Sequence, residues 1–278
     1  MDSTSAAGTY QNCSSPAQYT NLISGEVYTF YVQATDLAGN TSAIPASIEW
    51  SQENSNTAAL FHFDAGEELF DSGISGVDLD DFGTTADANG VFGQARLFDM
   101  TTSSSMTWSD NPMHDGLTSS MTIELWIKPT VFSNGQSMGL VSKMGGAGNN
   151  SFELSIHRQG GSKNARLSVN LTSDGTTMTV LESSNLHIGT DVLENGWNHV
   201  AFVYDMGSVL LFLNGTVVGT HTFGTLGSTV LFDSTANIDI GLSSAGDYFD
   251  GSMDEIRISQ TARYTGTFTV PASPFVMD

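Results

Sequence analysis

The chain has 278 residues, with 30 acidic residues against 8 Lys and Arg, and a formal net charge of −22. A surface this acidic repels phosphates, so we exclude nucleic acid and anionic membranes as partners and expect an extracellular, cell-surface or virion setting that suits divalent cations. The single cysteine, Cys13, excludes an internal disulfide, and no apolar run reaches the length of a membrane span.

Residues 28–42, YTFYVQATDLAGNTS, have the pattern of a strand, a tight turn and the start of a second strand. Aromatic and β-branched residues alternate with small and polar ones from Tyr28 to Ala34, and Asp36, Gly39 and Asn40 mark the turn. This pattern is typical of the last hairpin of a β-sandwich, yet only 27 residues precede it. The sequence therefore predicts a partial β-module over residues 1–50.

Residues 12–50 resemble the C-terminal half of the Ig-like or fibronectin type III-like modules of bacterial surface proteins. The resemblance depends on the order of Cys13-Ser-Ser-Pro, the hairpin above and the segment from Pro45 to Trp50. It implies that the partner of Cys13 lies upstream and that the chain is a piece of a longer multidomain protein. A sharper hypothesis is that a neighbouring copy supplies the missing strands to residues 1–50.

Residues 51–58 are polar and lack periodicity, so we predict a linker there and a second domain over 59–278. Short apolar runs separated by Gly, Asn and Asp then predict a dozen strands, and Asn214-Gly215 is a strong hairpin signal. The predicted strands are 59–63, 95–98, 121–128, 138–143, 152–157, 165–171, 178–182, 198–204, 209–214, 216–223, 236–240 and 252–258. The predicted fold class is all-β, an antiparallel two-sheet sandwich.

Residues 59–272 also resemble the laminin G-like, concanavalin A-like jelly-roll family. The motifs that carry the resemblance are LFHFD with DSG, GQARLFD, MTIELWIKP, WNHVAFVYD, VLLFLNGTVVG and DIGLSS followed by FDGSMDEIRI. The closing ARYTGTFTVP is similar to endings of such domains on phage appendages and large bacterial surface proteins. The resemblance implies a jelly roll, whereas the fold alone does not fix the function.

Three aspartates are candidate calcium ligands. Alternation in SMDEIRI places Asp254 on the same side as Ile256 and Ile258, where a carboxylate needs a hydrogen bond or a cation. Asp64 ends the LFHFD strand and Asp71 opens DSG. Acids at comparable positions bind calcium in several laminin G-like and pentraxin-like domains, so the resemblance implies Asp64, Asp71 and Asp254 as a ligand set. The alternative is that Asp254 hydrogen-bonds a neighbouring loop with no metal.

A denser group of acids follows in the same region. Residues 64–99 hold nine acids and one base, Arg96, and DLDDFG superficially resembles an EF-hand loop. Phe82 stands where that loop needs an oxygen ligand and Asn89 stands where it needs Glu, so we predict that Asp78, Asp80 and Asp81 form a solvated face.

Aromatic residues suggest where a ligand binds. Trp108, in the polar context MTWSDNP, and the pair Tyr248-Phe249, within GDYFDG, are predicted to lie on loops or strand ends and to contact carbohydrate. In MTIELWIKP, Ile123, Leu125 and Ile127 form one face and Trp126 lies on the other. We expect Trp126 to pack under a covering loop rather than to bind a sugar. For His199 we expect a satisfied structural role.

Catalytic motifs are missing from the sequence. Glucanases on related sandwiches need two carboxylates that flank the scissile bond, whereas ANIDIGLS offers Asp239 alone. There is no Gly-x-Ser-x-Gly elbow and no His-Glu-x-x-His spacing. We therefore expect a non-enzymatic, calcium-stabilised module that recognises glycan or a cell surface. The alternatives are a structural subunit of a phage appendage, capsid decoration or filament that contacts copies of itself, and an accessory domain of a secreted hydrolase.

Overall fold

The computed structural model describes residues 27–32, 34–36, 38–42, 46–51, 56–192 and 194–277. The chain divides into two compact units, one of residues 1–55 and one of Asn56–Met277. The second unit thus starts three residues before the predicted position 59, and its first strand occupies part of the predicted linker. Among the described residues, no helix has the length and apolar character needed to cross a membrane.

The first unit contains an antiparallel hairpin of β1 (Val27–Val32) and β2 (Ala46–Ser51). In the connection between them, Asp36 Oδ1 accepts hydrogen bonds from the backbone N–H groups of Ala38 at 2.9 Å and Asn40 at 2.8 Å. Strand β1 confirms the predicted strand. The hydrogen bonds to the Asp36 side chain close the predicted turn, as aspartate often does by binding backbone N–H groups that follow it in the sequence. Cys13 and the rest of residues 1–26, with their predicted Ig-like features, lie outside the described residues.

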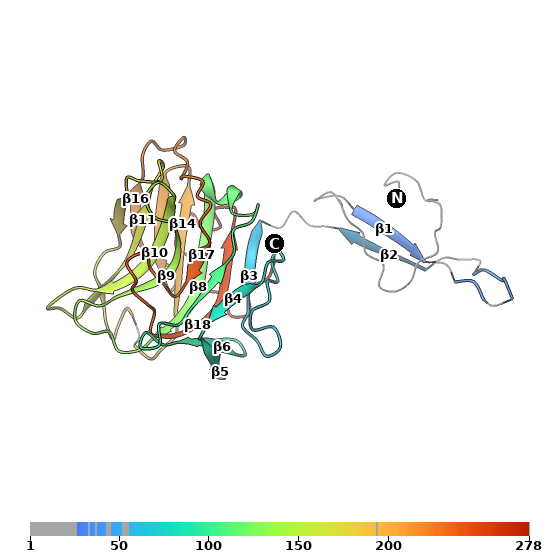
Figure 1. The fold of residues 1–278 in the computed structure, drawn as a ribbon, viewed down its shortest axis with the longest axis horizontal. Helices are drawn as coiled ribbons and strands as arrows, with labels where there is room; N and C mark the ends of the chain where they lie inside the picture. The colour runs from blue at the N-terminus through green and yellow to red at the C-terminus, as the bar shows by residue number, and fades with distance from the viewer. Residues whose placement is uncertain are drawn as a thin grey trace. The chain divides into compact units, whose positions relative to one another are not determined.

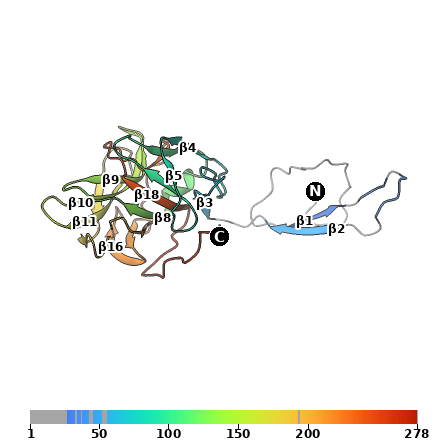
Figure 2. The same ribbon diagram turned by 90° about the horizontal axis from the view of Figure 1, so that it is seen from below.

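The second unit is a sandwich of two antiparallel sheets, as predicted (Figure 1). The β8 sheet has the strand order β16-β15-β14-β8-β18-β6-β5, with β3 paired to β18. The β9 sheet has the order β12-β11-β10-β9-β17-β7-β4, with β13 paired to β11. Seen from below, β4 and β9 of one sheet lie above β8 and β16 of the other (Figure 2).

The strands of the two sheets are short and are joined by turns. In the β8 sheet they are β3 (Thr57–Phe61), β5 (Thr85–Asp87), β6 (Ala95–Phe98), β8 (Ser120–Pro129), β14 (Asn198–Asp205), β15 (Ser208–Leu213), β16 (Thr216–Thr222) and β18 (Gly251–Ser259). In the β9 sheet they are β4 (Leu79–Phe82), β7 (Ser105–Trp108), β9 (Ser137–Met144), β10 (Asn150–Arg158), β11 (Asn164–Leu171), β12 (Thr179–Glu182), β13 (Leu186–His187) and β17 (Ile238–Ile240). One helical turn, Asp115–Thr118, precedes β8.

The core lies between the sheets and follows the alternation of each strand. On β8, Ile123, Leu125 and Ile127 are fully buried in it, as the sequence predicts. The turn between β15 and β16 is Asn214-Gly215, with φ of 49° and 74°. Two residues in the left-handed region match the turn type that closes two-residue hairpins. This turn confirms the hairpin predicted from its sequence.

Strand β18 contains a β-bulge at Glu255, and this bulge changes the facing of Asp254. Met253 pairs with Ile127 and Asp254 with Trp126, but the next pair is Arg257 with Glu124. One extra residue, Glu255 with φ of 50°, is therefore inserted into β18. The prediction that Asp254 faces the core with Ile256 and Ile258 is wrong, because the bulge resets the alternation and leaves Asp254 on the outer face of the sheet.

The outer face of the β8 sheet is covered by other parts of the chain. Trp126 lies edge-on to Phe92 of the 90–94 segment, with ring centroids 6.2 Å apart, which confirms that it packs under a loop. His199 is fully buried between Trp126 and the C-terminal residues Phe268 and Phe275. His199 Nε2 lies 3.3 Å from the carboxylate oxygen Oε2 of Glu124, whereas Nδ1 has no hydrogen-bond partner within the described part of the chain, so the predicted structural role is satisfied at one of the two ring nitrogens.

Candidate functional site

A row of polar side chains crosses the outer face of the β9 sheet. Thr107 of β7 pairs with Asp239 of β17, which pairs with Ser142 of β9. Ser142 pairs with Glu153 of β10, which pairs with Asn170 of β11. Since cross-strand partners share a face, these five side chains, which we call the polar row, point the same way as one transverse line.

The row continues to both edges of the sheet. Exposed Asp80 of β4 pairs with Thr107 at one end, and Val180 of β12, which is 58% exposed, pairs with Asn170 at the other. Seven strands at a spacing of about 4.8 Å give a line of roughly 29 Å. Ser142 and Glu153 in the middle of this line are 2% and 4% exposed, so the groups that a ligand can reach are those that flank them.

Glu153 occupies the centre of the row and is only 4% exposed. Its Oε2 accepts from Ser142 Oγ at 3.0 Å and from the backbone N–H of Ser244 at 2.5 Å, and its Oε1 accepts from Asn170 Nδ2 at 3.0 Å. Both carboxylate oxygens are therefore bound to protein donors. Glu153 orients its neighbours in the row and has no oxygen left over for proton transfer to a ligand.

Asp239 and Asn170 flank this centre and are half-buried. Burial raises the pKa of Asp239 above its usual value, and the hydrogen bond that Thr107 Oγ1 donates at 2.8 Å acts in the opposite direction. Asn170 Oδ1 is buried and accepts no hydrogen bond from the described residues. An unsatisfied acceptor is costly, and a hydroxyl donor from a ligand would relieve that cost.

The loop of residues 241–250 crosses the same face beside the row. It comes so close to β9 that a Cβ on Gly139 would lie 2.2 Å from Ser243 N. Its Tyr248, one of the predicted ligand contacts, is half-buried, and the backbone of Asp247 accepts from Gly139 N at 3.1 Å. Of the three aromatic residues predicted to contact a ligand, Tyr248 lies on a loop beside the polar row.

The other two predicted aromatic contacts belong to the core, so their predicted surface position is wrong. Trp108 is fully buried, with its ring 4.2 Å from that of His114 and 6.2 Å from that of Phe61. Phe249 is also fully buried and packs edge-on against Phe98. The polar residues around each of them in the sequence face away while these rings point between the sheets.

The predicted calcium ligands do not share a site. Asp71 Oδ1 accepts from the backbone N–H groups of Leu60 at 2.9 Å and Gly73 at 2.7 Å, and its Oδ2 accepts from Ser75. This carboxylate therefore ties the following loop to β3. No three acidic, histidine or cysteine side chains among the described residues are grouped so that they could hold a metal ion.

Asp254 and Asp64 are likewise engaged with backbone donors. Asp254 Oδ2 accepts from Val91 N at 2.7 Å and Phe92 N at 3.1 Å, and Asp64 Oδ1 accepts from Gln94 N at 2.9 Å. Calcium needs six to eight hard oxygens, and one carboxylate oxygen of each of these two residues is already bound to the backbone of the 90–94 segment. Asp64, Asp71 and Asp254 therefore do not fit the shared calcium shell, and the alternative in which Asp254 binds a neighbouring loop describes the geometry.

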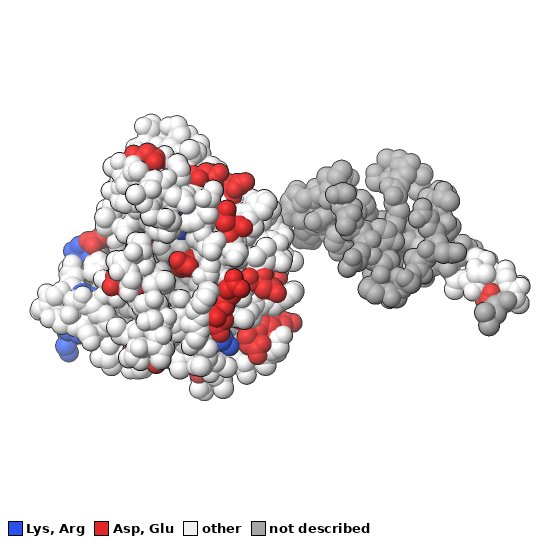
Figure 3. Space-filling view, viewed as in Figure 1, with Lys and Arg blue, Asp and Glu red and all other residues white. Residues whose placement is uncertain are grey.

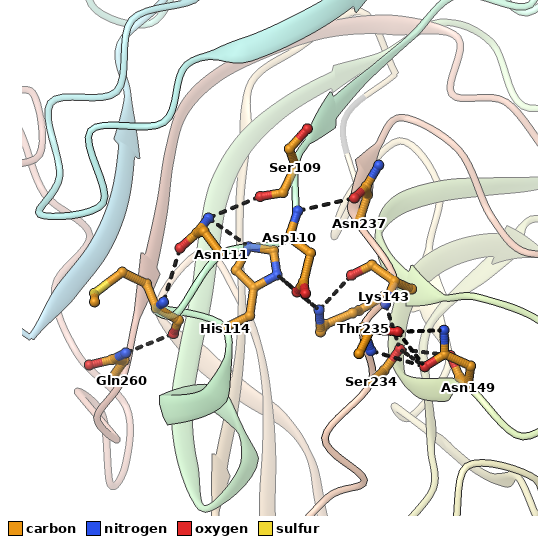
Figure 4. A network of polar contacts seen from close by, with 12 residues as sticks. Ser109, Asp110, Asn111, His114, Lys143, Asn149, Ser234, Thr235, Asn237 and Gln260 are labelled. Atoms are coloured by element: carbon orange, nitrogen blue, oxygen red, sulfur yellow. Dashed lines mark hydrogen bonds and ion pairs between the residues drawn. The ribbon is translucent and has the colours of Figure 1, made fainter.

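A buried lysine lies at the end of the core, where β9 meets the segment after β7 (Figure 4). Lys143 Nζ donates to Asp110 Oδ1 at 2.8 Å and to the carbonyl of Ala236 at 2.5 Å, and His114 Nδ1 lies 2.9 Å from both Nζ and Asp110 Oδ1. Burial, followed by the Lys143 charge, lowers the pKa of His114 to about 4. Three partners saturate the ammonium, so this cluster closes the sandwich rather than presenting a site.

Acidic side chains gather over the part of the second unit that contains β3, β4 and β6 (Figure 3). Asp78 and Asp80 are exposed, as the predicted solvated face requires. Asp81 is half-buried and pairs with Arg96 Nη2 at 2.6 Å. These acids make the surface next to one end of the polar row strongly negative, which disfavours anionic ligands there.

Two antiparallel sheets packed around one core, with a hydrogen-bonding row on the outer face of one of them, define a jelly-roll β-sandwich. Residues 100–265 match the model of the concanavalin A-like lectin/glucanases superfamily, and the chain belongs to this family. No match is found among the curated proteins.

Solved structures share this fold. Domain 4 of AbnA, an extracellular arabinanase from Geobacillus stearothermophilus in complex with arabinotriose, is 20% identical, with a TM-score of 0.52 over 76% of this chain and 95% of that domain. The binding domain of botulinum neurotoxin DC in complex with SialylT is 13% identical, with a TM-score of 0.56 over 75% of this chain. A botulinum neurotoxin type C structure, described through its interaction with two ganglioside molecules, is 14% identical, with a TM-score of 0.56 over 76% of this chain. This chain spans 49% and 50% of those two neurotoxin chains.

The polar row was missed by the sequence analysis. Each strand shows outward polar residues, but the line exists only once the strand order brings together positions as distant as Thr107 and Asp239. The one local signal was the pairing of outward Ser, Asn and Glu with inward aliphatic residues on β9, β10 and β11. That signal identifies the outer face of each strand, but it does not show which outward residues of different strands are neighbours.

Proposed function

We propose that this chain is a non-enzymatic, extracellular binding module that recognises a neutral glycan through the polar row. The observation that carries the proposal is the register that aligns Thr107, Asp239, Ser142, Glu153 and Asn170 on one face. Hydroxyl, amide and carboxylate groups in a line match the alternating hydroxyl groups of a sugar chain. Among the structures of the same fold, the complex with arabinotriose supports a neutral glycan, and the complex with SialylT supports carbohydrate binding in general.

The charge of the surface narrows the ligand class. The row contains two carboxylates and no base, and the whole chain carries a formal net charge of −22. An anionic glycan would meet repulsion without a compensating cation, whereas a neutral glycan would donate a hydroxyl proton to the half-buried carboxylate of Asp239. The two oxygens of Glu153 are bound to protein donors, which supports binding without catalysis at this row.

A glycan array that contains neutral and acidic oligosaccharides tests the proposal. We expect signals on neutral glycans, and two variants of the row, Asn170→Ala and Asp239→Asn, should weaken binding about 2- to 10-fold for each hydrogen bond lost. Asn164→Ala is the matched control, since Asn164 lies on the same strand as Asn170 but outside the row. Binding only to acidic glycans, or equal binding by Asn170→Ala, Asp239→Asn and wild type, would overturn the proposal.

A further inference from the structure

A pocket of about 430 Å³ lies away from the polar row, at the edge where the two sheets meet. One wall comes from residues 184–191, which include β13, and the other from the hairpin of β15 and β16. The backbone N–H of Ser184 donates to the carbonyl of Val218 at 2.8 Å and joins the two walls. The volume lies within the range of ordinary small-molecule sites.

The inner part of the pocket is apolar. Leu186 and Leu213 are 3% and 4% exposed, and Val217 and Val218 are half-buried beside them. Aliphatic side chains of this kind can pack against the C–H face of a sugar ring and gain free energy from the burial of both surfaces. They form an apolar contact surface for a ligand, although the pocket lining contains no aromatic residue.

The rim of the pocket carries polar groups with unused capacity. Asn214 Oδ1 accepts from His199 N at 2.8 Å, and Asp191 Oδ2 accepts from His187 N at 2.7 Å. These bonds fix both side chains, and across residues 56–192 and 194–277 no partner is found for Asn214 Nδ2 or Asp191 Oδ1. The rim therefore offers at least one donor and one acceptor that are held in place before a ligand arrives.

The loop that carries Asp191 is itself fixed by backbone bonds. Asp191 N donates to the carbonyl of His187 at 2.8 Å, and Gly189 N donates to the carbonyl of Val192 at 2.8 Å. Next to it, Asn185 Oδ1 accepts from Arg166 Nε at 2.9 Å. A wall that is already ordered loses little conformational freedom when it binds a small ligand.

Charge decides the class of that ligand. Asp191 is the ionisable residue of the lining, and no Lys, Arg or His faces the pocket within the described part of the chain. A carboxylate accepts strong, charge-assisted hydrogen bonds from neighbouring hydroxyl groups but repels another carboxylate. We propose that this pocket is a second binding site, separate from the polar row, that takes a single neutral sugar ring against Leu213 and Val217 with its hydroxyl groups on Asp191 and Asn214.

Nuclear magnetic resonance of the ¹⁵N-labelled full chain tests this site. The probes are methyl α-D-glucopyranoside, methyl α-D-mannopyranoside and methyl β-D-galactopyranoside, with sodium glucuronate as the acidic counterpart. We expect at least one neutral glycoside to shift the backbone amide signals of residues 184–191 and 213–218 in a saturable manner. Shifts from glucuronate alone, or no shift at these amides with any neutral glycoside, would overturn the proposal.

Variants locate the effect. Asp191→Asn should weaken binding of the neutral glycoside about tenfold, because a charge-assisted bond becomes a neutral one. Thr216→Val, which removes a pocket hydroxyl, should weaken binding about 2- to 10-fold, and Thr220→Val, on the same strand outside the lining, should not change it. Equal affinity for Asp191→Asn and wild type would reject the assigned role of the carboxylate.

The second site can fail or succeed independently of the polar row. Asn170→Ala alters the row and should leave the shifts at 184–191 and 213–218 unchanged, whereas Asp191→Asn should leave the glycan-array signal of the row unchanged. If Asn170→Ala abolishes the pocket shifts, the pocket is not a separate site and the inference is wrong.

Discussion

Asp254 and Asp64 hold the two ends of the same short segment. Asp254 Oδ2 accepts from Val91 N and Phe92 N, and Asp64 Oδ1 accepts from Gln94 N. The segment between them lies over the outer face of the β8 sheet, with Phe92 against Trp126. Two acids that lie 190 residues apart in the sequence thus hold the same segment against the sheet. The ionisation state of Asp254 therefore affects the stability of the fold.

The first prediction concerns Asp254 and pH. Burial, the largest effect, raises the pKa of Asp254 to about 7, while its Oδ1 has no hydrogen-bond partner among the described residues. A raised pKa in the folded state gives stability that is complete below the unfolded pKa of about 3.8 and is lost as pH rises towards 7. The free energy of unfolding of Asp254→Asn relative to wild type should therefore increase by about 2–3 kcal/mol as the pH rises from 5 to 8.

Urea unfolding of both proteins at pH 5, 6.5 and 8 measures this difference. Asp80→Asn, in which an exposed acid is neutralised, is the control and should follow wild type at each pH. Parallel pH profiles for Asp254→Asn and wild type would show that Asp254 does not titrate in this range.

The second prediction concerns the buried charge pair under the C-terminal segment. Glu124 is fully buried, and its Oε1 lies 2.7 Å from Arg257 Nη2, while Oε2 accepts from the hydroxyl of Tyr264 at 2.8 Å. Replacing Glu124 by Gln removes the buried carboxylate charge that Arg257 pairs with, so we expect a loss of about 3–5 kcal/mol in the free energy of unfolding. Denaturant unfolding at pH 7 measures it.

Two further variants control this measurement. Glu67→Gln, at an exposed acid, should change stability by less than about 0.5 kcal/mol. Tyr264→Phe removes one hydrogen bond to Glu124 and should cost about 1–2 kcal/mol, which keeps the test available if Glu124→Gln does not fold. Wild-type stability in both Glu124→Gln and Tyr264→Phe would contradict a role for the pair.

The third prediction concerns the lysine at the end of the core. Burial and the Lys143 charge together lower the pKa of His114 to about 4. In Lys143→Met the charge is gone and burial remains, so we expect the pKa of His114 to rise while staying below 6.5. An NMR titration of the ring protons of His114 measures this shift. An unchanged pKa of His114 in Lys143→Met would show that the Lys143 charge does not act on His114.

The fourth prediction concerns the close contact of β9 with the 241–250 loop. Ala at position 139 would place its Cβ 2.2 Å from Ser243 N, so the loop must move. We expect Gly139→Ala to cost about 1–3 kcal/mol and to weaken glycan binding by the polar row, since Ser244 N would leave Glu153. Gly160→Ala, with no atom within 4 Å of the added Cβ, should be neutral in both assays. A Gly139→Ala protein that matches wild type in both would contradict the contact.

The fifth prediction concerns calcium. Asp64, Asp71 and Asp254 hold backbone N–H groups, and the described residues contain no group of three acidic, histidine or cysteine side chains that could hold a metal ion. We expect calorimetry to give the same melting temperature with calcium at about 2 mM, a concentration at which extracellular calcium modules bind the ion, and with an excess of chelator. A higher melting temperature with calcium that is lost in Asp254→Asn would instead restore the calcium site implied by the family resemblance.

The fold was predictable from the sequence because its signals are local. Alternation on β8 identified Ile123, Leu125 and Ile127 as core residues, and Asn214-Gly215 identified a hairpin. Strand order is not a local property. The partners of Ser142 on either side are Asp239 and Glu153, and only the folded sheet makes them neighbours. The sequence therefore predicted the sandwich but not the row.

The errors at single residues have the same cause. A polar sequence context predicted exposure for Trp108 and Phe249, but large rings of either strand or loop are buried when they point between the sheets. Strict alternation predicted an inward Asp254, but the extra residue at Glu255 reversed it. Neither the direction of a ring in a loop nor an inserted strand residue leaves a periodic signal that a single sequence displays.

The inserted residue Glu255 also fixes the pairing register of β18 with β8. Pairs before it and pairs after it differ by one position, so β18 can match β8 in a single alignment. A slip by one residue would turn Arg257 towards the apolar core and Ile258 towards the polar outer face beside Glu124.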